Sequence, residues 1–258
     1  MDTPLRRLWT EGRCARAAWV TLNHPLVAES LARLGFDALC LDLQHGLLTE
    51  SDLLGMLQAV SQTGASALVR VPSHDPALIG RALDLGAAGV IVPLVNTPAE
   101  AAAVVAACRY PPAGRRSYGP VRASLLYGSD YAARANDAVS VFVMIETEQG
   151  LANLEAICDT PGLTGVFIGP IDLSYALGLP PQPDNPHPAH VAAVTRILEA
   201  CRRRGLVAGS FSDDPSFGRA LVEKGAQLVV VATDARCLTE AASARLRAFD
   251  APSRTSHT

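Results

Sequence analysis

Apolar runs that predict strands alternate along most of the chain with longer amphipathic stretches that predict helices. The predicted strands are 17–23, 38–44, 67–72, 89–95, 139–147, 163–168, 206–211 and 227–233. The predicted helices are 25–34, 50–63, 76–85, 98–109, 150–158, 188–204, 215–224 and 238–249. This alternation is typical of an α/β fold in which helices connect parallel strands. Eight such units favour a closed (β/α)8 TIM barrel over an open, doubly wound sheet.

Two segments interrupt the alternation. Residues 110–137 are rich in Pro, Gly and Arg, and we expect them to form a long connection after the fourth strand, on the catalytic side. Residues 179–190 are rich in proline, and they separate a short predicted helix at 173–177 from the next crossover helix.

Length and composition fit one barrel. A (β/α)8 barrel needs about 250 residues, so the 258 residues predict a single domain with its core at about 17–249 and a polar tail at 250–258. The apolar fraction is 49 % and the aromatic fraction only 5 %, which predicts an aliphatic core. A net charge of −3 without a long basic run argues against nucleic-acid binding.

Targeting signals and cysteine usage indicate the compartment. The first sixteen residues lack the apolar core of a signal peptide, and no apolar run reaches the roughly 18 residues of a membrane span. The six cysteines are widely spaced without a CxxC pair, as in reduced proteins. We therefore expect a soluble, cytoplasmic protein without a membrane partner.

Two carboxylates follow predicted strands that are one βα unit apart. Glu146 ends the apolar run 139–146, and Asp172 ends the run 165–172. If the strands are parallel neighbours, both side chains lie at their carboxyl ends, where an α/β barrel has its active site. Two carboxylates with open positions suit a hard divalent cation.

Further polar residues follow the second and third strands. Strand alternation directs Asp42 and Gln44 toward the barrel interior and leaves His45 at the mouth, which favours a catalytic histidine. Arg70 lies within an aliphatic strand and needs an anionic partner. That partner is either a structural carboxylate or a substrate carboxylate or oxyanion. Asp84, near a helix end, by itself is more typical of a solvated surface residue.

A sharp turn at 169–174 leads from a strand into the short helix. Backbone N–H groups at such a helix start can bind an anion. The chain lacks both G-x-x-x-x-G-K-[ST] and G-x-G-x-x-G, which disfavours nucleotides and phosphosugars as substrates.

Together these segments resemble the HpcH/HpaI aldolases, the metal-dependent class II pyruvate aldolases of the phosphoenolpyruvate/pyruvate barrel superfamily. The resemblance covers most of residues 17–235, and its motifs are Leu41–Gly46, Arg70-Val71-Pro72, Gly86–Thr97, Arg109–Arg116, Ile145-Glu146-Thr147 and Val166–Ser174.

The resemblance implies a catalytic set. A divalent metal, Mg, Mn or Co, would be held by Glu146 and Asp172. His45 would be the general base, Arg70 would stabilise the enolate, and Asp84 would raise the basicity of the histidine.

The resemblance also implies how substrate and subunits bind. The substrate would contact Arg70 and Asp172, and its carboxylate would rest on backbone amides around Gly169 and Ile171. Family members are usually homohexamers, trimers of dimers, with exchanged C-terminal helices, so the helix at 238–249 is expected to pack on a neighbour.

Two positions depart from the commonest family pattern. Gln44 stands where many members have glutamate, which puts in doubt any role of that carboxylate in positioning water. Met144 stands where some members use glutamine, so it offers no side-chain amide to the substrate.

The implied reaction is the reversible cleavage of a 4-hydroxy-2-oxo acid into pyruvate and an aldehyde. The only lysine, Lys224, lies near the end of the seventh predicted helix, which argues against a Schiff-base mechanism. One alternative is an acyl-CoA lyase of the citrate lyase β-subunit or malyl-CoA type, with Arg115, Arg116 and Arg122 binding the CoA phosphates. Another is a non-catalytic, metabolite-binding barrel, which predicts no metal dependence and no pyruvate release.

Overall fold

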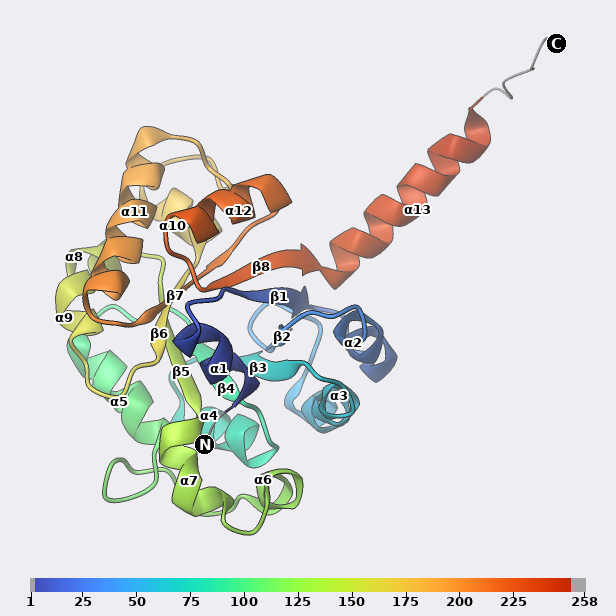
Figure 1. Ribbon diagram of the computed structural model, residues 1–258. Helices are drawn as coiled ribbons and strands as arrows, with labels where there is room; N and C mark the ends of the chain where they lie inside the picture. Colours follow the sequence, from blue (N-terminus) through green and yellow to red (C-terminus); the bar gives the residue numbers. More distant parts are fainter. Residues whose placement is uncertain (1–2, 252–258) are drawn as a thin grey trace.

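The protein folds as a closed barrel of parallel strands surrounded by helices (Figure 1). The computed structural model describes residues 3–251. The barrel closes in the order β1-β2-β3-β4-β5-β6-β7-β8. The strands are β1 (Ala15–Val20), β2 (Ala38–Asp42), β3 (Ser66–Arg70), β4 (Gly89–Val92), β5 (Ser140–Ile145), β6 (Gly165–Ile168), β7 (Val207–Phe211) and β8 (Leu228–Thr233). The predicted (β/α)8 barrel is confirmed, and each predicted strand overlaps an observed one.

The helices form an outer layer around the strands (Figure 1). They are α1 (Pro4–Thr10), α2 (Pro25–Ala32), α3 (Glu50–Ser61), α4 (Pro76–Asp84), α5 (Pro98–Cys108), α6 (Val121–Tyr127), α7 (Tyr131–Ala138), α8 (Glu148–Ala152), α9 (Leu154–Cys158), α10 (Pro170–Ala176), α11 (Pro188–Arg203), α12 (Pro215–Glu223) and α13 (Asp234–Asp250). The predicted helix at 150–158 is two short helices, α8 and α9, joined at Asn153.

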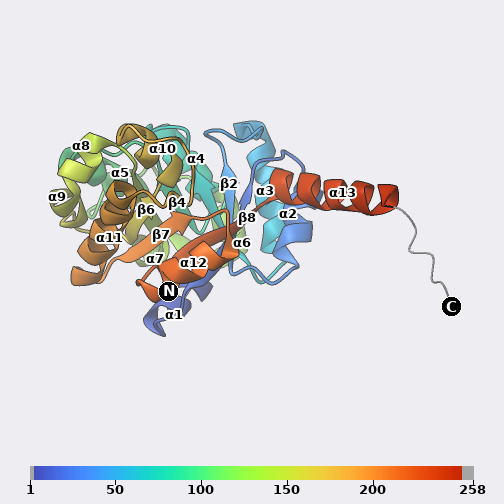
Figure 2. The same cartoon turned by 90° about the horizontal axis from the view of Figure 1, so that it is seen from above.

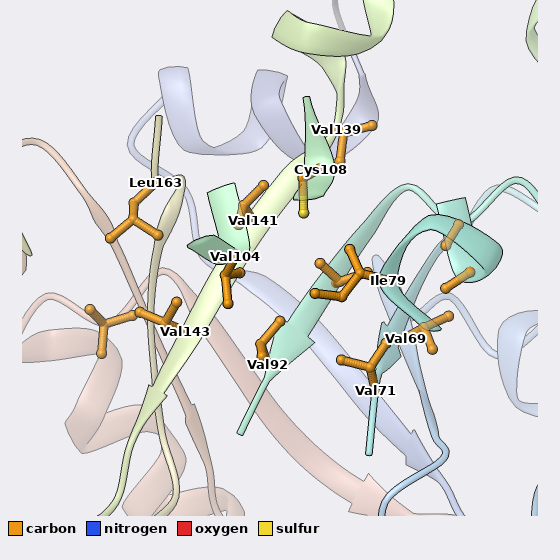
Figure 3. Close-up of a cluster of buried hydrophobic side chains, with 14 of the residues drawn as sticks. Val69, Val71, Ile79, Val92, Val104, Cys108, Val139, Val141, Val143 and Leu163 are labelled. Carbon is orange, nitrogen blue, oxygen red and sulfur yellow. The ribbon is translucent and has the colours of Figure 1, made fainter. Parts of the chain in front are cut away.

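Strand alternation divides the apolar residues into two layers. One face of the strands packs against the helices, as Figure 3 shows for Val69, Val92 and Val141 beside Ile79 and Val104. The other face fills the barrel interior, whose members include Trp19, Phe142, Met144 and Phe167. Both tryptophans are in or against the interior cluster, while the outer layer is mainly aliphatic, as predicted, with the tyrosines Tyr110 and Tyr131 among its buried members.

Helix α1 was not predicted, and it closes the amino-terminal end of the barrel. Its Leu5 is buried, and the Trp9 ring meets the Phe142 ring edge-to-face with centroids 5.7 Å apart. The Trp9 indole N–H also donates to the Gln227 carbonyl at 2.9 Å. This end of the barrel is thus filled by packing.

The expected position of residues 110–137 was wrong. The segment follows helix α5, not strand β4, so it connects a helix to β5 and lies at the amino-terminal end of the barrel. It contains α6 and α7, and Arg122 and Tyr127 donate to the carbonyls of Leu85 and Gly86, just before β4. The long connection therefore covers the end opposite to the carboxyl ends of the strands.

Helix α13 extends away from the barrel (Figures 1 and 2). It begins at Asp234, earlier than the predicted 238, and continues through residue 250, where the polar tail was expected to begin. Residues 252–258 of the expected tail lie outside the described residues. Between residues 3 and 251, no helix has both the length and the apolar character required to cross a membrane.

Candidate active site

A cavity of about 470 Å³ lies at the carboxyl ends of the strands. It contains most of the residues predicted to be functional, together with aromatic and hydroxyl side chains. Its lining residues are Trp19, Thr21, Asp42, His45, Arg70, Met144, Phe167, Gly169, Pro170, Ile171, Asp172, Phe211 and Thr233. A larger cavity, about 810 Å³, lies at the amino-terminal end, but the side chains that line it include no pair of carboxylates. The carboxyl-end cavity is therefore the candidate active site.

Arg70 and Asp42 form a buried bidentate ion pair across β2 and β3. The Arg70 Nε donates to Asp42 Oδ1 at 2.8 Å, and Nη2 donates to Oδ2 at 2.6 Å. The Trp19 indole N–H donates to Asp42 Oδ2 at 3.1 Å, and the Arg70 guanidinium lies 4.8 Å from the centre of the Trp19 ring. A fork-to-fork pair fixes the plane of the guanidinium, so Arg70 is held rigidly at the cavity wall.

The Arg70–Asp42 pair remains charged. Burial would raise the pKa of Asp42, but the Arg70 guanidinium and the Trp19 N–H hold that pKa below its ordinary value. Burial would likewise lower the pKa of Arg70, yet Asp42 and, more weakly, Glu146 keep it raised. The anionic partner that the sequence required for Arg70 is therefore Asp42, and the guanidinium still lines the cavity.

The turn after β2 presents His45 at the mouth. Asp42 Oδ1 accepts the backbone N–H groups of Gln44 and His45 at 3.0 and 3.3 Å. A side chain on Gly46 would put its Cβ 2.3 Å from the Asp42 carbonyl oxygen, so this tight turn requires glycine. The His45 ring is exposed and lines the cavity, which leaves its nitrogens accessible to a bound ligand.

Glu146 follows β5 and is almost completely buried, with an exposed fraction of 3 %. Its Oε1 accepts the Leu94 backbone N–H at 2.7 Å. Leu94 has a positive φ of 54°, an uncommon conformation for a residue with a side chain, and this conformation directs the N–H toward the carboxylate. Burial is the main reason that the pKa of Glu146 rises to about 7; the Leu94 N–H opposes the shift, and the charge of Asp172 adds to it.

Asp172 follows β6, the neighbour of β5, and is exposed at the cavity. The turn at Gly169 packs directly on the other carboxylate, because a Cβ on Gly169 would lie 2.2 Å from Glu146 Oε2. The predicted side-by-side placement of the two strands is thus observed, and the two carboxylates interact electrostatically.

These two carboxylates fit a hard divalent cation. One Glu146 oxygen is occupied by the Leu94 amide, which leaves Oε2 and the Asp172 carboxylate as oxygen donors. A cation would offset the repulsion between the two acids and favour the ionised form of Glu146. Within residues 3–251, no group of three or more His, Cys, Asp and Glu side chains could hold a metal. The remaining coordination positions would be left for water and substrate oxygens.

Asp84 is not part of this cluster. It ends α4 just before β4, at the amino-terminal end of the barrel, whereas His45 lies at the carboxyl ends of the strands, on the opposite side of the same barrel. Asp84 Oδ1 accepts from Arg116 Nη2 at 2.7 Å, and the Asp84 side chain is 23 % exposed. One chain therefore brings together His45, Arg70, Glu146 and Asp172, but not Asp84.

Several residues at the site were not singled out from the sequence. Strand alternation predicted that Asp42 points to the barrel interior, but it did not predict the pairing with Arg70. Trp19 and Leu94 had no predicted role. The departure at Met144 is visible in the structure, because the buried Met144 side chain lines the cavity without offering an amide. Gln44 does not line the cavity, and its buried Oε1 has no hydrogen-bond partner within residues 3–251.

Comparison with known proteins identifies the family of this chain. The sequence profile described as HpcH/HpaI aldolase/citrate lyase matches residues 16–241. The chain belongs to this family. It is 41 % identical over 238 residues to a hydroxypyruvate/pyruvate aldolase of Rhizorhabdus wittichii, covering 92 % of this chain and 95 % of that protein. It is 35 % identical over 256 residues to a 2-keto-3-deoxy-L-rhamnonate aldolase of Salmonella gallinarum, covering 96 % and 94 %.

A solved HpcH/HpaI aldolase/citrate lyase family structure from Burkholderia cenocepacia has the same fold. Its TM-score is 0.91 at 31 % identity, and the match covers 97 % of this chain and 100 % of that one. The predicted family, fold and enzyme class, a lyase of the aldolase type, are thereby confirmed.

Proposed function

We propose that this family member is a class II pyruvate aldolase that reversibly cleaves a 4-hydroxy-2-oxo acid into pyruvate and an aldehyde. The observation that carries the proposal is the meeting of Asp172, Arg70 and His45 at one cavity. The buried Glu146 carboxylate lies next to this cavity and interacts electrostatically with Asp172 and Arg70. The names of the relatives, hydroxypyruvate/pyruvate aldolase and 2-keto-3-deoxy-L-rhamnonate aldolase, agree with it.

Glu146 and Asp172 would hold the divalent cation, Mg, Mn or Co. When bound, such a cation supplies Lewis acidity that polarises the keto group of the 2-oxo acid and stabilises the enolate charge. The chain's part is to offer carboxylate oxygens while excluding water from Glu146, whose burial is nearly complete. The Leu94 N–H holds the Glu146 carboxylate in one orientation.

Arg70 would stabilise the negative charge that develops on the 2-oxo acid oxygen as the carbon–carbon bond breaks. Its guanidinium is already fixed by Asp42 and stacked on Trp19, so little reorganisation is needed at the moment of reaction. The other edge of the guanidinium remains available to substrate at the cavity wall.

His45 would remove the C4 hydroxyl proton in cleavage and return it in synthesis. Its exposed ring at the cavity and its backbone tie to Asp42 support this role, since a general base must reach the substrate from a fixed turn. The substrate carboxylate would bind at the backbone around Gly169 and Ile171, both of which line the same cavity beside Asp172.

Asp84 can act on His45 only from another copy of the chain. Its side chain is partly exposed, and its single ion pair, to Arg116, leaves one carboxylate oxygen for such a contact. We therefore propose that the predicted role of Asp84 belongs to the assembled oligomer.

Helix α13 supports a homo-oligomer, which we expect to be a hexamer, a trimer of dimers. Its apolar residues Leu238, Leu246 and Phe249 are 63 %, 63 % and 87 % exposed. The helix extends beyond its own barrel (Figure 2). A projecting helix with exposed apolar residues is a suitable element for exchange with a neighbour. The six free cysteines are compatible with the cytoplasmic location that forms part of the proposal.

The acyl-CoA lyase alternative finds less support. Arg116 is paired with Asp84, and Arg122 donates to Leu57, Leu85 and Ser61. Both arginines lie at the end of the barrel opposite to the cavity, so the same chain does not offer them to CoA phosphates there.

The test is pyruvate release after metal removal. Chelated protein is assayed with a panel of 4-hydroxy-2-oxo acids, with pyruvate coupled to a reporter, before and after addition of Mg, Mn or Co. We expect activity only with metal, and less than 1 % of it in Glu146→Gln and Asp172→Asn, by an order-of-magnitude estimate for loss of a metal site. Glu148→Gln, an exposed neighbour on α8, is the matched control and should retain full activity.

Two results would reject the proposal. One is metal-independent pyruvate release in the chelated protein. The other is the absence of pyruvate release from every acid in the panel with each metal present.

A further inference from the structure

The cavity has a second end that the reaction above leaves unused. In the closed strand order, β1 and β8 lie across the barrel mouth from β5, which carries Glu146. Thr21, just after β1, and Thr233, at the end of β8, both line the cavity on that far side. The aromatic rings of Trp19 and Phe211 lie beside them, 6.2 Å apart and edge-to-face.

Thr21, Thr233, Trp19 and Phe211 form the far wall of the cavity. Asp234, the first residue of α13, holds the Thr21 part of this wall in place. It is buried, with 4 % exposed, and its carboxylate accepts the Thr21 backbone N–H at 3.0 Å and the Leu22 N–H at 2.8 Å. The Thr21 hydroxyl donates to Asp234 Oδ1 at 2.7 Å. A buried carboxylate satisfied by three donors of one turn holds that turn rigidly.

These contacts determine what Thr21 and Thr233 can offer a ligand. The Thr21 hydroxyl proton is committed to Asp234, so its remaining lone pair can accept from a ligand hydroxyl. The Thr233 hydroxyl has no hydrogen-bond partner within residues 3–251, so it can donate or accept. The far wall therefore contains two threonine hydroxyl groups together with the aromatic side chains of Trp19 and Phe211.

The charges near this wall exclude an anion. The arginine that lines the cavity is Arg70; one edge of its guanidinium is paired with Asp42, and its other edge is the one assigned above to the 2-oxo acid. Behind Thr21 stands the carboxylate of Asp234, and the nearby Arg236 is paired with Asp213 and Glu240. A second carboxylate or a phosphate on the ligand would meet negative charge here without a compensating cation.

We propose that Thr21 and Thr233, positioned by Asp234, form the acceptor end of the active site and select a short, neutral aldehyde that carries a hydroxyl group. The inference rests on the proposed aldolase function, because the acceptor must occupy the cavity beyond the 2-oxo acid bound at Glu146 and Asp172. Thr21 and Thr233 contact the substrate in this proposal, and Asp234 is a positioning residue.

The experiment measures aldol addition of pyruvate to three acceptors in the metal-loaded enzyme. Glycolaldehyde carries the hydroxyl, acetaldehyde lacks it, and glyoxylate replaces it with a carboxylate. We expect kcat/KM for glycolaldehyde to exceed the values for the other two by about tenfold or more, as for a site built to bind a hydroxyl. Equal values for glycolaldehyde and acetaldehyde, or a preference for glyoxylate, would overturn the proposal.

Three variants test which residues cause the preference for glycolaldehyde over acetaldehyde. Thr21→Val and Thr233→Val should each reduce the preference for glycolaldehyde over acetaldehyde to about threefold or less, through a higher KM for glycolaldehyde. Asp234→Asn should also reduce the preference for glycolaldehyde. Thr10→Val, at the other end of the barrel, is the control and should leave this preference unchanged. An unchanged preference in both threonine variants would overturn the proposal.

Proton exchange at pyruvate C3 separates this inference from the proposed function. The exchange involves only the 2-oxo acid, so the threonine and Asp234→Asn variants should retain the wild-type rate in heavy water. A variant that lost exchange would indicate general damage, which contradicts a role confined to the acceptor. Absence of exchange in the wild type would instead be a failure of the proposed function.

Discussion

Two arginine–aspartate pairs in this protein lie at opposite ends of the barrel, a buried bidentate pair of Arg70 with Asp42 and a single-bonded pair of the buried Arg116 with the partly exposed Asp84. Arg70 meets Asp42 at 2.6 Å, and Arg116 meets Asp84 at 2.7 Å. Each guanidinium also lies over an aromatic ring, Arg70 at 4.8 Å from the centre of Trp19 and Arg116 at 4.5 Å from that of Tyr110.

The surroundings of the two pairs differ. Arg70 lines an open cavity beside Glu146, so the charge of the pair is available to a ligand. The Arg116 side chain lies between Tyr110 and Tyr131 and donates to the Tyr131 hydroxyl at 3.2 Å, which fastens the connection between α5 and β5. A buried ion pair therefore does not by itself mark an active site; its position at the carboxyl ends of the strands and its neighbours do.

The largest effect is expected from Arg70→Lys. Lysine keeps the charge but loses the planar fork, so it cannot both satisfy Asp42 and stabilise the enolate. We expect kcat for aldol cleavage to fall about 10²- to 10³-fold with a small change in melting temperature. Steady-state kinetics and thermal denaturation measure both quantities. Unaltered kcat would remove Arg70 from the reaction.

Metal affinity should depend on pH through Glu146. The pKa of this carboxyl is raised to about 7, so below pH 7 the metal must displace a proton, and above pH 7 it need not. The apparent Kd for Mn²⁺ should therefore increase about tenfold for each unit of pH decrease below 7 and level off above it. Calorimetric titrations between pH 5.5 and 8 check this expectation, and a flat profile would show that Glu146 is ionised throughout.

Arg116→Lys should change stability more than Arg70→Lys does. The substitution leaves Asp84 and the Tyr131 hydroxyl with poorer partners in a packed site, so we expect the free energy of unfolding to fall by about 2 kcal/mol. Denaturant unfolding of Arg116→Lys and Arg70→Lys, side by side, measures the difference. A larger loss of stability in Arg70→Lys would reverse the distinction drawn between the two pairs.

Asp84→Asn tests whether the second pair also serves catalysis in the oligomer. If Asp84 orients His45 in a neighbouring subunit and raises its basicity, the loss of the carboxylate makes that histidine a less effective general base. We therefore expect kcat for aldol cleavage to fall about tenfold, as measured by steady-state kinetics. An unchanged kcat would confine Asp84 to its ion pair with Arg116.

Much of the fold was predictable because its signals are local. Apolar runs of strand length and cap residues such as Thr97 and Asp214 define the βα units, and Glu146 and Asp172 could be placed on adjacent strands by chain order alone. Helix α1 was missed although Thr3 caps it and Pro4 begins it, because it precedes the first βα unit and is only seven residues long; its contact between Trp9 and Phe142 is not visible in the sequence.

The site was less predictable where it depends on contacts between distant segments. Nothing in the sequence indicates that Leu94 adopts a positive φ and donates to Glu146, because no glycine marks that position. The pairing of Arg70 with Asp42 follows from the register of β2 and β3, which the sequence does not state. Residues 110–137 were assigned to the wrong end of the barrel because they were expected to follow the fourth strand directly. Helix α5 lies between that strand and this segment.

The most direct test of the metal-dependent aldolase is pyruvate C3–H exchange in heavy water, followed by NMR, in chelated protein before and after addition of Mn²⁺, with Mn²⁺ removed again by chelation before spectra are recorded. The two carboxylates together predict no exchange above the uncatalysed rate without metal, rapid exchange with metal, and no recovery in Glu146→Gln at any metal concentration. Rapid exchange in the chelated protein, or full recovery in Glu146→Gln, would contradict the assignment of Glu146 and Asp172 as the metal-binding pair.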